Sequence, residues 1–167
     1  MGVRFNVDEI LEMAETIEAN GERFYYRAAE LVSDPDARSM LMGLAEAEVA
    51  HRKLFAGMRK DLPAREKGGG MGPPDEEMSG YLKAWADGQV FDATRDAAAD
   101  LTGNESLEDI LRMAMDREKD SVVFYVGLKS ATPKSWGREK IDAIIGEEMK
   151  HIAILNTEMG KLQGRVN

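Results

Sequence analysis

An internal repeat constrains this chain of 167 residues more than any other feature of its sequence. When the sequence is compared with itself at an offset of 100 residues, identical residues align without a gap at positions spread from residue 10 to residue 51. The aligned pairs are Ile10 and Ile110, Leu11 and Leu111, Met13 and Met113, Ala14 and Ala114, Glu18 and Glu118, Phe24 and Phe124, Tyr25 and Tyr125, Glu48 and Glu148, and His51 and His151. Self-similarity at a fixed offset indicates a duplicated structural unit.

Each unit is predicted to be a pair of helices. In the first unit, Asn6 followed three residues later by Glu9 is typical of a capping box, and apolar residues then recur at alternating spacings of four and three. Asp34 is a plausible N-cap for the second helix, with Pro35 in its first turn, and we expect that helix to end near Asp61.

The second unit repeats these helix signals. Ser106 with Asp109 resembles the first capping box, and Thr132 followed by Pro133 resembles the cap and proline that separate the first two helices. We therefore expect the last helix to begin at this proline and to carry an apolar stripe interrupted by Glu148 and His151.

Loop lengths predict the topology. Four helices of roughly 25 residues would each be about 37 Å long, the scale of a four-helix bundle. Short turns make each helix pair antiparallel, whereas a segment of about 42 residues can run the length of a bundle. We predict one all-α, ferritin-like domain over residues 1–167, with hairpins at about 6–61 and 104–161 and a crossover at about 62–103.

The crossover itself is expected to contain a short helix around residues 75–86. Its Tyr81, Leu82 and Trp85 would pack on the bundle or on a neighbouring subunit. We accordingly expect a homodimer or a higher homo-oligomer.

Composition narrows the function classes. The absence of cysteine excludes thiolate metal sites, cysteine nucleophiles and iron–sulfur modules on this chain. A formal net charge of −9 without a basic tract argues against nucleic acid or an anionic membrane as a partner. No run approaches 18 apolar residues and the first residues lack the apolar core of a signal peptide, so we expect a cytoplasmic protein.

Polar residues interrupt the apolar stripes at equivalent places in both units. Glu18 and Glu118 lie in line with the apolar residues of their helices, and the two Glu-x-x-His pairs occupy consecutive stripe positions, Glu48 with His51 and Glu148 with His151. Residues three apart project about 60° from each other on a helix, so each carboxylate and imidazole can reach one point in the interior.

Four buried carboxylates require cations, and no lysine or arginine occupies these stripe positions. Two divalent metal ions would balance the four glutamates, and a mixed carboxylate and imidazole set suits iron, manganese or sometimes zinc. One glutamate from each of two helices plus Glu-x-x-His from the other two is the ligand pattern of di-iron and di-manganese carboxylate bundles. The alternative is a duplicated bundle that keeps polar core pairs for register without binding metal.

These segments resemble the ferritin-like, rubrerythrin-type di-iron domain over almost the whole chain apart from the crossover. The segments that carry the resemblance are Ile17-Glu18, Phe24-Tyr25, Glu46-Ala-Glu48-Val-Ala-His51, Arg117-Glu118-Lys119, Phe124-Tyr125 and Glu147-Glu148-Met-Lys-His151. The resemblance implies two iron ions that react with peroxide or dioxygen. It also implies that Glu48 and Glu148 bridge the metals and that Glu18, Glu118, His51 and His151 complete the ligand set.

The chain departs from rubrerythrins in two ways. It has no cysteine for a rubredoxin domain, so electrons would come from a separate protein, and Ser121 stands where rubrerythrins carry a further glutamate. The six ligands are equally compatible with a ferroxidase-like centre, and an iron-storage protein remains an alternative. Tyr25 and Tyr125 either hydrogen-bond a metal ligand or quench a radical at the centre, or are core aromatics.

Overall fold

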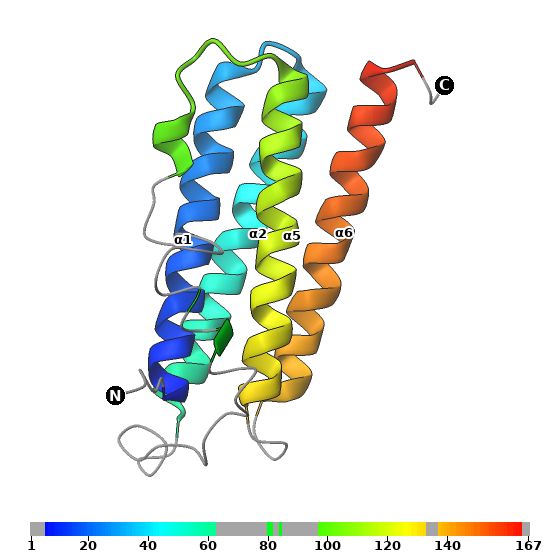
Figure 1. The fold of residues 1–167 in the computed structure, drawn as a ribbon. Coiled ribbons are helices and arrows are strands. Elements are labelled where there is room, and N and C mark those ends of the chain that lie inside the picture. Colours follow the sequence, from blue (N-terminus) through cyan, green and yellow to red (C-terminus); the bar gives the residue numbers. More distant parts are fainter. Residues whose placement is uncertain (1–5, 63–79, 82–83, 85–96, 133–136, 165–167) are drawn as a thin grey trace.

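Four long α-helices form the bundle in a computed structural model that describes residues 6–62, 80–81, 84, 97–132 and 137–164 (Figure 1). They are α1 (Val7–Leu31), α2 (Pro35–Lys60), α5 (Leu107–Ala131) and α6 (Arg138–Leu162). The described residues contain no strand. The predicted all-α, four-helix fold class is therefore confirmed.

The predicted N-caps of three helices are present. Asn6 and Glu9 form a reciprocal capping box at the start of α1, and Ser106 and Asp109 form one at the start of α5. The Asp34 side chain accepts a hydrogen bond from the amide of Ala37 at 2.8 Å and so caps α2. Each cap satisfies amide groups that the first turn of a helix leaves without a partner.

The start of α6 differs from the prediction. Thr132 ends α5, because both its amide and its hydroxyl donate to the carbonyl of Leu128, the hydroxyl at 2.7 Å. The helix α6 begins at Arg138 after Gly137, which has a φ of 74° and makes no side-chain cap. The expectation that Thr132 and Pro133 open the last helix is thus wrong for Thr132, and Pro133 lies outside the described residues.

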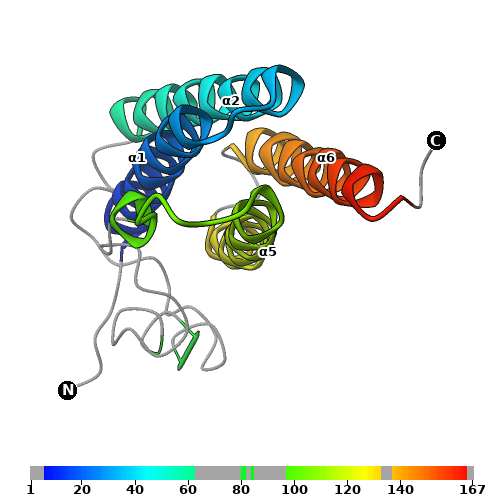
Figure 2. The ribbon, with the colours of Figure 1, turned by 90° about the horizontal axis from the view of Figure 1, so that it is seen from above.

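The topology follows from where the helices begin and end. The helices α1 and α2 form one antiparallel hairpin and α5 and α6 form the other (Figures 1 and 2). The end of α2 and the start of α5 lie at opposite ends of the bundle, so the chain between them crosses its full length (Figure 1). This arrangement makes α2 and α5 parallel and accounts for the length of the crossover.

Little of the crossover is described. A 3-10 helix, η1 (Ala97–Asp100), lies beside α1 and is followed by the buried Leu101; no pattern in the sequence pointed to it. The helix expected around residues 75–86 falls mostly outside the described residues, including Leu82 and Trp85. Tyr81 is described, and it packs against an apolar cluster of the bundle, as expected.

Two apolar clusters fill the bundle, one toward each end. The first joins the start of α1 and the end of α2 to the end of α5 and the start of α6, and the second joins the opposite halves of the four helices. Between them, each helix contributes polar residues in place of apolar ones. Of the helices in the described part of the chain, none combines the length and apolar character needed to cross a membrane.

Candidate metal centre

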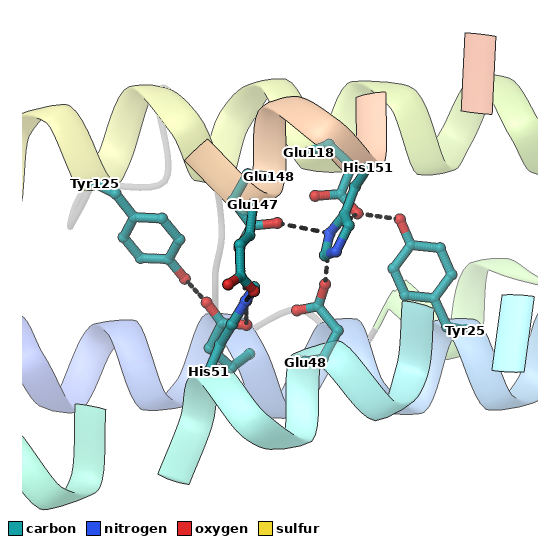
Figure 3. Close-up of polar contacts among 9 residues, drawn as sticks. Tyr25, Glu48, His51, Glu118, Tyr125, Glu147, Glu148 and His151 are labelled. Carbon is teal, nitrogen blue, oxygen red and sulfur yellow. Dashed lines mark hydrogen bonds and ion pairs between the residues drawn. The ribbon is translucent and has the colours of Figure 1, made fainter. Parts of the chain in front are cut away.

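Six buried polar side chains meet in the layer between the two apolar clusters (Figure 3). None of them is more than 7% exposed. They come from all four helices and are the six residues predicted as metal ligands: Glu18, Glu48, His51, Glu118, Glu148 and His151. The structure therefore brings every predicted ligand to one place.

The six side chains form two overlapping groups of donors. Glu48, Glu118, Glu148 and His151 make one group, and Glu18, Glu48 and His51 make the other. Within each group the donor atoms lie within 4.8 Å of one another. Glu48 belongs to both groups, which is the geometry expected of a carboxylate shared by two metal ions.

Glu148 lies between the two imidazole rings. Its Oε1 is 3.0 Å from Nδ1 of His51, and its Oε2 is 2.9 Å from Nδ1 of His151. The rings are stacked with centroids 5.7 Å apart and planes 20° apart. One carboxylate thus contacts the Nδ1 atoms of both histidines.

Each tyrosine reaches across the bundle to a glutamate of the other unit. The Tyr25 hydroxyl donates to Glu118 Oε1 and the Tyr125 hydroxyl donates to Glu18 Oε1 (Figure 3). Both rings are fully buried, one in each apolar cluster, and burial raises the pKa of both hydroxyls well above 10. The expectation that each tyrosine hydrogen-bonds a predicted ligand is confirmed. These hydrogen bonds fix the orientation of the two carboxylates.

Glu147 is a residue whose contact the sequence did not reveal. Its side chain is 51% exposed, as expected for the outer face of α6, but its Oε2 lies 2.8 Å from Nε2 of His51. A carboxylate on the outer nitrogen of a ligating histidine fixes the ring and its tautomer. The repeat contains one signal for this contact, which is a difference between the units: Ala47 stands where the second unit has Glu147. Accordingly, among the described residues, His151 has no carboxylate on its outer nitrogen.

Replacing Glu147 by Ala is expected to weaken metal binding at the donor group that contains His51. Loss of such an outer carboxylate commonly costs 10–100-fold in metal affinity, so we expect about that loss for one of two bound ions. Anaerobic titration with Co(II), followed by absorption, measures both ions separately. Glu139→Ala removes an exposed carboxylate from the same helix and should leave both affinities unchanged. Equal binding by the two variants would contradict this role for Glu147.

The electrostatics of the layer favour protonated histidines where no metal compensates the carboxylates. Burial opposes the charge on both rings, yet contacts with Glu148 and Glu18 raise the pKa of His51 to about 11. Contacts with Glu118 and Glu148 likewise raise the pKa of His151 to about 9.

The carboxylates respond to the same surroundings in different directions. Burial, reinforced by Glu18, raises the pKa of Glu48 well above its usual range, and burial raises that of Glu118 to about 7. Burial also acts on Glu148, but its two imidazole neighbours outweigh this and lower its pKa to about 2. Raised pKa values mean that, without metal, protons on the histidines and on two of the glutamates offset the negative charge of the layer.

Several buried donor atoms of the layer approach one another within ion-pair distance but form no well-aligned hydrogen bond. These atoms are Glu18 Oε2, His51 Nδ1, both carboxylate oxygens of Glu148, and His151 Nδ1. Buried polar atoms are nearly always hydrogen-bonded, and these point at one another across the same space. Carboxylate and imidazole donors in this number fit iron, manganese or zinc.

Comparison with known proteins supports the fold. Neither a protein-family model nor a curated protein sequence matches this chain. A crystal structure of a protein from Thermotoga maritima, provisionally assigned as ferritin-like and diiron-carboxylate, is similar to it with a TM-score of 0.69 and 23% identity. The match covers 93% of this chain and 95% of that one. The chain therefore has a ferritin-like four-helix fold.

Proposed function

We propose that this protein is a rubrerythrin-like di-iron oxidoreductase that reacts with hydrogen peroxide or dioxygen, either reducing peroxide or oxidising Fe(II). The observation that carries the proposal is the layer of four glutamates and two histidines, which is buried, drawn from all four helices and rich in donor atoms that form no well-aligned hydrogen bond. The similar Thermotoga maritima protein, with its diiron-carboxylate description, supports the choice of iron.

The six polar residues of the layer would hold two metal ions. Glu18, Glu48 and His51 would hold one ion, and Glu118, Glu148 and His151 the other, with Glu48 and Glu148 placed to bridge them. Iron held there supplies one-electron redox chemistry and Lewis acidity toward the oxidant.

The tyrosines orient the glutamates that α1 and α5 contribute to the layer. The hydroxyls of Tyr25 and Tyr125 each donate to Oε1 of a glutamate, and Oε2 of Glu18 is left without a hydrogen bond and would be available to metal. The apolar clusters on both sides keep bulk water from the layer. A separate protein would donate the electrons, since this chain has no cysteine.

Metal content tests the proposal directly. We expect about two iron ions per chain in protein purified without added metal, as the donor set predicts. The ferric absorption should bleach on reduction and return with peroxide. Protein that contains no metal and takes up none from excess Fe(II) would overturn the proposal. A closed shell of many subunits in solution would indicate iron storage instead, whereas we expect a homodimer.

A further inference from the structure

Gly21 lies in the middle of α1, buried and one turn after Glu18. A methyl group placed on its Cα would lie 2.5 Å from Oε2 of Glu48 and 2.8 Å from its Cδ. Neither distance is sterically possible. With any other residue at position 21, the Glu48 carboxylate could not stay where it is.

The backbone does not require glycine at this position. The glycines with positive φ among the described residues are Gly103, Gly137 and Gly164, so Gly21 has the ordinary helical conformation. Glycine inside a helix is less favourable than alanine because it loses more conformational freedom on folding. Space for Glu48 is therefore what glycine provides here.

Three other helical glycines lack such a neighbour. A Cβ at Gly43, Gly57 or Gly146 would meet nothing within 4 Å. The equivalent of Gly21 in the second unit is Ser121, which has a Cβ. None of these three glycines faces a glutamate, and the second unit has a Cβ at the position equivalent to Gly21.

The two equivalent glutamates use their space differently. Glu148 lies between the imidazole rings, whereas Glu48 lies against α1 and has its Oε1 4.0 Å from Nδ1 of His151. From that position Glu48 is the carboxylate common to both groups of donors.

We infer that Gly21 is a positioning residue of the metal centre: it lets the Glu48 carboxylate lie against α1, where it can serve both metal ions. The effect of Gly21 on metal binding rests on the proposed function. The close contact between Gly21 and Glu48 does not, because it exists without metal and can be measured separately.

The contact is tested in metal-free protein by a double-mutant cycle. In a Glu48→Ala background the space is open, so Gly21→Ala should raise the melting temperature, as alanine does in a helix. In the chelator-treated parent we expect a clearly smaller gain, or a loss, because the new methyl group displaces the Glu48 carboxylate. Gly57→Ala, the matched control, should raise the melting temperature equally in both backgrounds. If Gly21→Ala changes the melting temperature by the same amount in both backgrounds, the inference is overturned.

The consequence is tested by anaerobic titration with Fe(II). We expect the parent to bind two ions and Gly21→Ala to bind the second at least about tenfold more weakly, as happens when a ligand loses its orientation. If the parent binds two ions and Gly21→Ala binds both equally well, the inference is wrong and the proposed function stands. If the parent binds none, the proposed function fails, and with it the role of Gly21 in metal binding. The cycle in metal-free protein would still report the steric contact.

Discussion

Loading with Fe(II) is expected to raise the melting temperature of this protein by about 10 °C for one tightly bound ion, and by more for two. An ion present at 1,000 times its dissociation constant stabilises the folded state by about 4 kcal/mol. In domains of 150–250 residues, each kcal/mol shifts the melting temperature by about 2–4 °C. The effect should be large here because the donors come from both hairpins, so metal would join the two halves of the bundle.

Glu48→Ala should remove most of the rise in melting temperature that Fe(II) produces. Glu48 is the donor common to both groups, so its loss weakens both ions at once. Without metal, we expect the variant to melt within a few degrees of the parent. The packing lost with the side chain is offset by removal of a buried carboxyl group crowded by Glu18 and Glu148.

Glu46→Ala is the matched control for this substitution. It removes an exposed carboxylate two residues earlier on the same helix and should keep the full gain with metal. Differential scanning calorimetry of chelated and Fe(II)-loaded samples measures all three proteins under anaerobic conditions. If Glu48→Ala gains as many degrees as the parent, the assignment of Glu48 as a shared ligand is wrong.

The features that could be predicted from the sequence depend on short-range patterns. A capping box joins residues three apart, as Asn6 and Glu9 or Ser106 and Asp109 do, so it can be recognised without knowing the fold. The buried glutamates and histidines of the layer also follow a pattern, because the repeat places Glu48 and Glu148 at the same stripe positions of their helices.

The features that were missed depend on contacts between distant residues. The contact between Glu147 and His51 joins residues 96 apart, and it exists only because α6 brings an outward residue beside the edge of α2. The role of Gly21 likewise depends on how closely α2 approaches α1. Thr132 was misassigned because a threonine before a proline is compatible with either the end or the start of a helix.

The stability of the metal-free protein is expected to fall as pH rises from about 6 to 9, the opposite of the trend caused by carboxylates whose pKa is lowered by native ion pairs. The folded-state pKa values of His51 and His151 are about 11 and 9, against an ordinary value of 6.5. A raised pKa contributes stability that is fully present below the unfolded value and is lost as pH rises through the folded value.

The buried acids change stability in the same direction. The pKa of Glu118 is about 7 and that of Glu48 is also raised, so their contributions begin to fall above pH 4.5. Glu148, with its pKa lowered to about 2, loses its contribution only at much lower pH.

Urea unfolding of chelator-treated protein between pH 6 and 9 measures how the free energy of unfolding changes with pH. Each proton held by the folded state but not by the unfolded chain lowers the free energy of unfolding by about 1.4 kcal/mol per pH unit. Between pH 7.5 and 8.5 the two histidines are such groups, so His51→Asn should make the slope shallower by about one proton.

Because metal replaces these protons, the stabilisation by Zn(II) or Mn(II) should grow over the same range. Metal-free protein that becomes more stable as pH rises would show that the layer is not protonated in this way.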